Sequence, residues 1–286
     1  MKNSKLKNRI VIGSANFSQN YGIGLTKIRY SEIKKILKLA KKNDIYEIDT
    51  AEGYLKDKNI FKNIDKKFQL STKIIPNHKW ISLEFCQKKL ENHSKNFNGN
   101  KIKTLFFHDI KILLSKNGSK IFKNLEVLKK KKYFEKIGIS IYDPDCLNYL
   151  VTNYNFNVVQ CPYNILDKRI LSTKWFDKLK KLNIETHIRS VFLQGLLVNK
   201  LIHKKRYFKK WQEKITKWFA WLENNNFSPI DYCLSDLSHH DFDKIIIGID
   251  NHEHLKKIIN YKKINKKKMQ NFTTNDTRLI DPRNWK

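Results

Sequence analysis

Cysteine is scarce in this chain, and signals for export or membrane insertion are missing. Four cysteines occur among 286 residues, far apart, at Cys86, Cys146, Cys161 and Cys233. No two of them have the close spacing of a zinc site or a redox loop, so we expect buried free thiols in a reducing compartment. The first residues are charged but have no apolar segment behind them, which argues against a signal peptide. No apolar run has the length of a membrane span. We predict a cytoplasmic protein that does not cross a membrane.

Acidic residues are also few, because 27 Asp and Glu oppose 58 Lys and Arg and leave a formal net charge of +31. Clustered cations bind nucleic-acid phosphates, but these lysines are spread along nearly the whole chain, on the outer faces of the predicted helices. The aromatic and basic motifs of nucleic-acid-binding modules are absent, so we expect no nucleic-acid partner. The densest basic cluster, Lys262 to Lys268, remains a candidate contact for an anionic partner.

Short apolar runs rich in β-forming residues alternate with longer stretches of helical periodicity. The predicted strands are Arg9–Gly13, Tyr46–Asp49, Phe68–Lys73, Thr104–His108, Lys136–Ser140, Val158–Pro162, Ile184–Ser190 and Lys244–Gly248. The predicted helices are Ser31–Asn43, Lys58–Ile64, Ser82–His93, Ser119–Lys131, Asp145–Tyr154, Thr173–Leu182, Tyr207–Asn225, one beginning after Pro229, and His252–Ile259. Each predicted strand is therefore followed by a helix.

Strict alternation of strands and helices predicts a parallel sheet, because parallel neighbours need a crossover between them. An open doubly wound sheet is the competitor, but it usually carries a glycine-rich phosphate loop after its first strand. Here the first strand runs into Gly13-Ser14-Ala15-Asn16-Phe17, which lacks that loop. Eight units within about 260 residues favour closure of the sheet. We predict a single-domain α/β protein over residues 1–286, a (β/α)8 TIM barrel with its core at 9–259 and a basic C-terminal extension at 260–286.

Polar residues follow the second, third and fourth predicted strands, where the active site of such a barrel lies. Asp49, Lys73 and His108 end these strands, and Tyr54 lies in the loop after the second. Reduction of a carbonyl needs a hydride at carbon and a proton for the alkoxide. A tyrosine can supply the proton if an adjacent lysine lowers its pKa from about 10, and a carboxylate can hold that lysine. A histidine can orient the carbonyl oxygen. These four residues are the candidate catalytic group.

The segment Glu47–Tyr54, EIDTAEGY, resembles the aldo-keto reductase signature D-T-A-x-x-Y. The lysine and histidine motifs of that family are similar to Ser71–Lys73 and Leu105–Asp109. Further similar stretches, in order along the chain, are Gly138-Ile139-Ser140, Val159-Gln160-Cys161-Pro162-Tyr163-Asn164, Gly195-Leu196-Leu197 and Gly248. The resemblance therefore spans almost the whole chain.

This resemblance implies an NAD(P)-dependent oxidoreductase that reduces an aldehyde or ketone, with Tyr54, Lys73, Asp49 and His108 in catalysis. It implies a small-molecule carbonyl substrate and a cofactor bound without a Rossmann fold, NADP first and NAD as the other candidate. Ser140 and Gln160 would hydrogen-bond the nicotinamide carboxamide, residues 189–194 would wrap the pyrophosphate, and residues 248–255 would meet the adenosine half. The expected cofactor-binding residues are Ser140, Gln160, Arg189, Ser190, Gly248 and Asn251. No metal site is expected.

Several positions depart from the family's pattern. Arg189 ends the seventh strand, where many members place an aromatic residue under the nicotinamide; it could stack there, pair with a carboxylate, or clamp an anionic substrate group. Asp250 stands where a small hydroxyl residue is common, and its negative charge would disfavour a 2′-phosphate. Residues 15–23 resemble a bacterial subgroup found among surface-polysaccharide genes, which suggests a sugar-like substrate. The alternative function is a catalytically weak barrel that serves as a cofactor-binding or regulatory module. The oligomeric state stays open.

Overall fold

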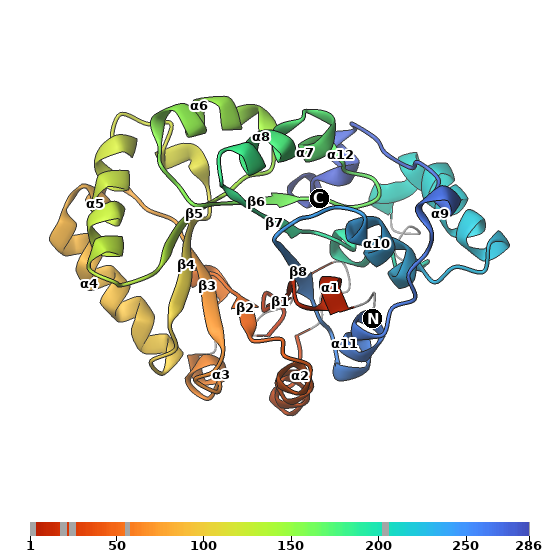
Figure 1. Ribbon diagram of the computed structural model, residues 1–286, viewed down its shortest axis with the longest axis horizontal. Helices are drawn as coiled ribbons and strands as arrows, with labels where there is room; N and C mark the ends of the chain where they lie inside the picture. Colours follow the sequence, from red (N-terminus) through yellow and green to blue (C-terminus); the bar gives the residue numbers. More distant parts are fainter. Residues whose placement is uncertain (1–3, 18–21, 23–26, 55–57, 202–205, 286) are drawn as a thin grey trace.

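Eight parallel strands close into a barrel in the order in which they occur along the chain (Figure 1). The computed structural model describes residues 4–17, 22, 27–54, 58–201 and 206–285. The barrel closes where β8 pairs with β1, in a register that sets Gly13 opposite Gly248. The strands are β1 Ile10–Gly13, β2 Glu47–Asp49, β3 Gln69–Ile74, β4 Ile102–Phe107, β5 Lys136–Ser140, β6 Val158–Pro162, β7 Glu185–Arg189 and β8 Lys244–Gly248. The predicted (β/α)8 barrel is confirmed.

Helices surround this barrel, as Figure 1 shows. They are α1 Ser4–Lys7, α2 Tyr30–Lys42, α3 Lys58–Lys62, α4 Leu83–Ser94, α5 Gly118–Lys130, α6 Leu147–Asn153, α7 Arg169–Ser172, α8 Trp175–Lys181, α9 Gln212–Asn224, α10 Pro229–Ser238, α11 His252–Ile259 and α12 Thr277–Ile280. The predicted helix at 145–154 starts later, because Asp143 caps a 3-10 turn that begins with Pro144. The predicted helix at 207–225 likewise begins as a 3-10 helix, Arg206–Trp211, before α9. The short α7 was not predicted.

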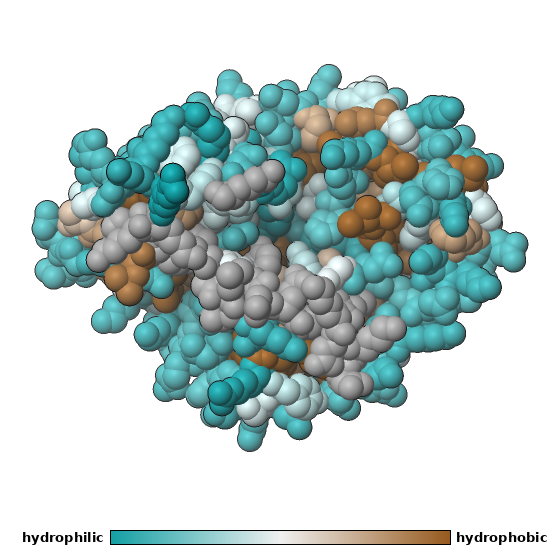
Figure 2. Space-filling view, turned by 180° about the vertical axis from the view of Figure 1, so that it is seen from behind, coloured by the Kyte–Doolittle hydropathy of each residue, from teal (hydrophilic) through white to brown (hydrophobic). Residues whose placement is uncertain are grey.

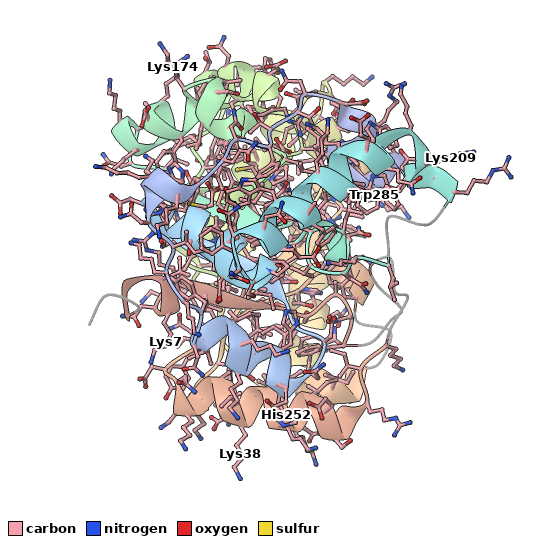
Figure 3. All side chains as sticks on the ribbon, turned by 90° about the vertical axis from the view of Figure 1, so that its right-hand side faces the viewer. Lys7, Lys38, Lys174, Lys209, His252 and Trp285 are labelled. Carbon is pink, nitrogen blue, oxygen red and sulfur yellow. The ribbon has the colours of Figure 1, made fainter. Side chains whose placement is uncertain are left out.

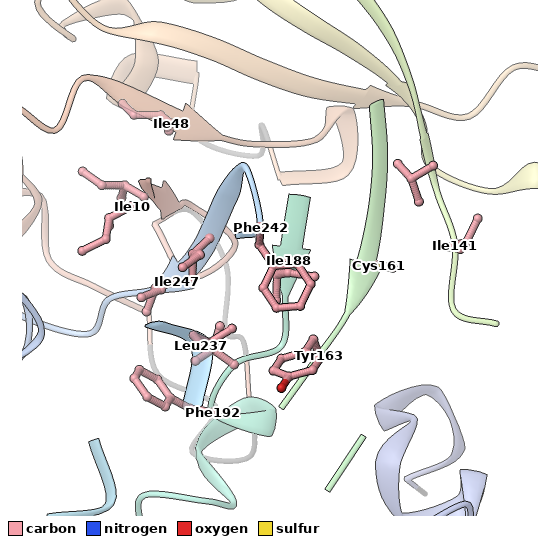
Figure 4. Packing of buried hydrophobic residues seen from close by; sticks show 14 of the residues in the cluster. Ile10, Ile48, Ile141, Cys161, Tyr163, Ile188, Phe192, Leu237, Phe242 and Ile247 are labelled. Carbon is pink, nitrogen blue, oxygen red and sulfur yellow. The ribbon is translucent and has the colours of Figure 1, made fainter. Parts of the chain in front are cut away.

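The outward faces of the strands form the main hydrophobic core with the surrounding helices. Side chains alternate between the two faces of a strand, so every second residue points at the helices. Figure 4 shows part of this layer, where Cys161, Tyr163 and Ile188 lie near Phe242. The rings of Tyr163 and Phe242 have centroids 4.9 Å apart. The ring of Phe176 in α8 lies 4.8 Å from that of Phe242, so this packing links the segments beside β6 and β8 to the helix layer.

The inner face of the barrel is filled by a phenylalanine ring beneath the carboxyl end of the strands. Phe106 of β4 pairs with Gly138 of β5, and a Cβ on Gly138 would lie only 2.3 Å from the Phe106 ring. Glycine is therefore required there, since any larger residue would displace the ring. The Phe106 ring centroid is 5.8 Å from Nζ of Lys73. The ring thus forms the floor under the polar groups that end the neighbouring strand.

The loop after β7 contains several non-glycine residues with left-handed backbone. Ser190, Leu193 and Gln194 have φ angles of 62°, 45° and 51°, so β7 ends at Arg189, one residue earlier than predicted. Each such residue costs on the order of 1–3 kcal/mol of backbone strain. The side chain of Asn164, which follows β6, donates to the carbonyl oxygen of Ser190 at 3.2 Å and helps to hold this conformation.

The basic C-terminal extension is packed into the fold. Leu279 and Ile280 of α12 are fully buried, and the ring of Phe272 lies 5.0 Å from that of Trp218 in α9. The N–H of Thr274 also donates to the carbonyl oxygen of Leu166, in the segment between β6 and α7. Figure 1 shows α12 near α7. The extension therefore contributes to the same core as the barrel helices.

Lysines cover the outside of the molecule. Figure 2 shows a mostly hydrophilic face, and Figure 3 shows Lys38, Lys174 and Lys209 extending away from the body. Over the described ranges, the helices are too short or too polar to span a bilayer. The four cysteines are free, as predicted; three of them are buried, whereas Cys146 is only partly buried.

Candidate active site

A cavity of about 370 Å³ lies at the carboxyl ends of the strands. The candidate catalytic residues Asp49, Tyr54, Lys73 and His108 all line it. The predicted cofactor residues that line it are Ser140, Gln160, Arg189, Ser190 and Gly248. Residues from the first to the eighth strand therefore meet around one space, because parallel strands in a closed barrel all end on the same side.

Lys73 and Asp49 form a buried ion pair at the bottom of the cavity. Nζ of Lys73 donates to Oδ1 of Asp49 and, at 3.3 Å, to the carbonyl oxygen of Thr50. The two charged side chains are only 5% and 8% exposed. Nε2 of Gln160 donates to Oδ2 of Asp49 at 2.8 Å, so each carboxylate oxygen has its own donor. Burial lowers the pKa of Lys73, although the charge of Asp49 opposes that effect.

Tyr54 and His108 lie side by side in the same cavity. A 3-10 turn, Glu52–Tyr54, carries Tyr54 back toward the strand ends, and its ring centroid is 6.2 Å from that of His108, with the planes at 83°. The backbone N–H of His108 donates to the carbonyl oxygen of Ile74 at 2.8 Å, which continues the pairing of β3 and β4 past the end of β4. The imidazole is thereby fixed beside the phenol.

The pKa of His108 is lowered to about 4, chiefly by burial and in addition by the positive charges of Lys73 and Arg189. We expect its NMR titration to have a midpoint near that value. The unfolded chain would bind a proton with a pKa of about 6.5, so folding stability is lost as the pH falls from 6.5 toward 4. Urea unfolding across this window should show a shallower loss for His108→Gln than for the parent. A His108 resonance that titrates at an unperturbed value would contradict this assignment.

The cavity has features that fit a nicotinamide cofactor. Oε1 of Gln160 is buried and, among the described residues, has no hydrogen-bond partner. A buried amide oxygen without a donor is costly, and a carboxamide N–H of a ligand could satisfy it. A Cβ built on Gly248 would meet nothing within 4 Å, so the end of β8 leaves open space beside the cavity.

Arg189 enters the cavity from the end of β7. Its guanidinium donates to the carbonyl oxygen of Ile141 at 2.9 Å and to Oγ of Ser190 at 3.3 Å. Its central carbon lies 4.0 Å from the ring centroid of Tyr142. Of the interpretations made from the sequence, an ion pair with a protein carboxylate is not observed among the described residues. The guanidinium instead stacks on a tyrosine of this chain.

The far end of the cavity is bounded by the first turn of α11. Oδ1 of Asp250 accepts a hydrogen bond from Nδ2 of Asn16 at 3.0 Å. Asn251 is not among the residues that line the cavity; its side chain caps α11 by accepting from the N–H of His254 at 2.8 Å. His254 itself lines the cavity beside Phe192, with ring centroids 5.8 Å apart.

Sequence reasoning missed some of the residues around this cavity. Tyr142 was not singled out, although it lies two residues beyond the end of β5, and His254 was covered only as part of the stretch 248–255. The rule that strand ends face the site could have found Tyr142. Of the stretch 15–23, Ala15, Asn16 and Gly22 line the cavity, whereas residues 18–21 and 23 lie outside the described residues.

Comparison with known proteins decides the family. The aldo/keto reductase family model matches residues 9–276, nearly the whole chain. The chain belongs to the aldo/keto reductase family. Membership supports carbonyl reduction with a nicotinamide cofactor in general terms and agrees with the resemblance found in the sequence.

Solved structures share the fold of this aldo/keto reductase at low sequence identity. An aldo-keto reductase from Bacillus halodurans, in its holo form, is 14% identical with a TM-score of 0.73, covering 92% of this chain and 90% of its own. A glycerol dehydrogenase from Gluconobacter oxydans is 15% identical with a TM-score of 0.67, covering 91% and 88%. No curated protein sequence gives a significant match.

Proposed function

We propose that this chain reduces an aldehyde or ketone to an alcohol, with Tyr54 as the proton donor. One observation carries the proposal: a single cavity is lined by all four candidate catalytic residues. Three of them, Asp49, Lys73 and His108, come from the ends of β2, β3 and β4, and Tyr54 comes from the loop after β2. Each of them alone has an ordinary structural explanation. Their convergence is what carbonyl reduction requires, because the alkoxide must receive a proton where its charge develops.

Lys73 and Asp49 prepare Tyr54 for this step. A cation beside a phenol favours the phenolate and so makes the proton easier to release. Asp49 and the carbonyl oxygen of Thr50 hold the ammonium of Lys73 in one position, and Gln160 holds Asp49 in turn. Because burial lowers the pKa of Lys73, this ammonium can also return a proton to the phenolate after turnover.

His108 is the candidate for orienting the substrate oxygen. With a pKa lowered to about 4 it is neutral at physiological pH. A neutral imidazole can still donate one hydrogen bond to the carbonyl oxygen, and it does so without competing with Tyr54 as an acid. Its ring stands edge-on to that of Tyr54, so one substrate oxygen can lie between the two groups.

The cofactor would occupy the side of the cavity formed by β5 to β8. When bound, it supplies the hydride that reduces the carbonyl carbon. Ser140 and Gln160 would hold its carboxamide, and Ser190 and Gly248 would contact the rest, whereas Asn251 would act indirectly by capping α11. We expect NADP(H), with NAD(H) as the other candidate because the carboxylate of Asp250 borders the cavity.

The direct test is a titration of the protein with NADPH and, in parallel, with NADH, in which tryptophan fluorescence is monitored. Quenching by either cofactor, followed by its oxidation in the presence of sugar-derived or simple aldehydes, is the expected result. Quenching without turnover of any carbonyl would favour the alternative of a cofactor-binding or regulatory module. Absence of both would overturn the proposal.

Replacing Gln160 with methionine tests the cofactor side of the cavity. A net hydrogen bond contributes about 0.5–1.5 kcal/mol, so the cofactor Kd should rise roughly 2- to 13-fold. Methionine keeps the length of the side chain but offers neither the amide oxygen nor the donor to Asp49. Fluorescence titration measures the change. An unaltered Kd would show that the unpartnered oxygen of Gln160 does not meet the cofactor.

A further inference from the structure

Arg189 leaves the catalytic end of the cavity with an unbalanced positive charge. The described residues place four charged groups around the cavity: Asp49, Lys73, Arg189 and Asp250. The first two neutralise each other in their ion pair, and Asp250 lies at the far end, where it accepts a hydrogen bond from Asn16. His108 adds no charge at physiological pH. Within the described part of the chain, the guanidinium of Arg189 donates only to a carbonyl oxygen and a hydroxyl, and neither carries a charge. One net positive charge therefore faces the space beside Lys73 and His108.

This charge lies close enough to the catalytic residues to act on them. The field of Arg189 lowers the pKa of both Lys73 and His108. A partly buried cation without a counter-ion is unfavourable, because its lost hydration is not replaced by an opposite charge. An anion that entered the cavity would supply the missing partner, and guanidinium groups bind carboxylates and phosphates in a two-pronged geometry.

Arg189 is also held in place before any ligand arrives. Its guanidinium lies 4.0 Å from the ring centroid of Tyr142, and that of Arg283 lies 3.5 Å from the same centroid. At these distances one face of a ring has room for a single guanidinium, so the two must lie on opposite faces. Arg283 is fixed by a two-pronged pair with Asp281, in the C-terminal extension. Tyr142 thus holds Arg189 by stacking on one face of its guanidinium, which lowers the entropy lost on binding an anion.

We propose that the substrate is an anionic carbonyl compound whose carboxylate or phosphate binds the guanidinium of Arg189 while its carbonyl faces Tyr54 and His108. This inference rests on the proposed function and adds the chemical class of the substrate. A phosphate of the cofactor is the other source of an anion at this place. The two sources differ in what Arg189 controls, namely the choice of substrate or the affinity for the cofactor.

The test uses pairs of aldehydes that differ in charge: succinic semialdehyde against butanal, and glyceraldehyde 3-phosphate against glyceraldehyde. The parent protein should favour the anionic member of at least one pair in kcat/KM by roughly 10- to 100-fold, as expected for a hydrogen bond to a charged group. Arg189→Gln should bring that ratio close to one, while the Kd values for NADPH and NADH stay within about twofold. Arg189→Lys should give an intermediate ratio, since it keeps the charge but loses the planar fork.

The net charge of +31 could attract anions by itself, so a matched variant is needed. Arg29→Gln removes the same charge from the exposed residue before α2, which does not line the cavity. It should keep the parent ratio. If Arg29→Gln and Arg189→Gln lowered the ratio equally, the preference would come from the overall charge and the inference would be wrong.

Two further outcomes would overturn the inference. Equal kcat/KM values within both pairs would show that Arg189 does not select an anion. A rise of tenfold or more in the cofactor Kd of Arg189→Gln, with the substrate ratio unchanged, would assign Arg189 to a cofactor phosphate. Calorimetric binding of succinic semialdehyde to the Tyr54→Phe protein and to its Arg189→Gln double variant tests the anion contact without turnover. It therefore separates failure of this inference from failure of the proposed reaction.

Discussion

Tyr54→Phe should lower kcat by roughly 100- to 10,000-fold, which is the range that a positioned general acid contributes. The phenol oxygen is the only atom lost, so the cavity keeps its shape and the cofactor Kd should stay the same. Steady-state kinetics with the best aldehyde and a fluorescence titration measure the two quantities. Phenylalanine can keep the edge-on contact with the ring of His108, so we expect the variant to fold normally and its inactivity to come from the lost hydroxyl.

Tyr149→Phe is the matched control for this variant. Tyr149 lies in α6 and is 45% exposed, and it does not line the cavity. Its loss of a hydroxyl should leave kcat unaltered. If Tyr54→Phe also turned over as fast as the parent, the proton would have to come from another group, and Lys73 would be the next candidate.

Lys73→Met should lower the free energy of unfolding by about 3–5 kcal/mol, the usual effect of removing one partner from a buried ion pair. The carboxylate of Asp49, whose side chain is 8% exposed, would keep Gln160 as a donor but would have no counter-charge. Equilibrium unfolding in urea measures the loss. Activity should also disappear, because the cavity would lose the cation that we propose lowers the pKa of Tyr54.

The double variant Asp49→Asn/Lys73→Met separates these two effects. Without a charge on either side chain, most of the lost stability should return, whereas activity should not. Lys217→Met provides the control, because Lys217 pairs with Glu213 on the surface of α9, where both side chains are more than 70% exposed. The free energy of unfolding of Lys217→Met should equal that of the parent within experimental error. A Lys73→Met protein as stable as the parent would show that the buried pair does not stabilise the fold.

The barrel and the candidate catalytic group could be predicted because both follow from local patterns. Strand and helix periodicity fixes the order of the elements, and the parallel arrangement then brings the strand ends together. Asp49, Lys73 and His108 could be selected as candidates because each lies at the end of a predicted strand. A one-residue error at the end of β4, where His108 lies just beyond Phe107, did not alter this result.

The support of Arg189 could not be predicted in the same way. Tyr142 and Arg283 stand 47 and 94 residues from Arg189 in the sequence, and their stacking depends on how the C-terminal extension folds back. Composition describes that extension as basic, which gives no sign that Leu279 and Ile280 are buried. The second donor to Asp49 was hidden for a similar reason, since Gln160 could be assigned to a ligand but not to a neighbouring side chain.

The left-handed residues after β7 bear on how this protein responds to selection for heat resistance. Leu193 and Gln194 adopt backbone angles that glycine reaches without steric cost. Leu193 is fully buried, so glycine there would remove a packed side chain, and a search for thermotolerant variants would be drawn to Gln194. Gln194 borders the cavity, and glycine there would remove its side chain from the wall and widen the opening. Thermal stability and ligand selectivity are thus opposed at this loop. A variant with a higher melting temperature should therefore also be tested for loss of ligand selectivity.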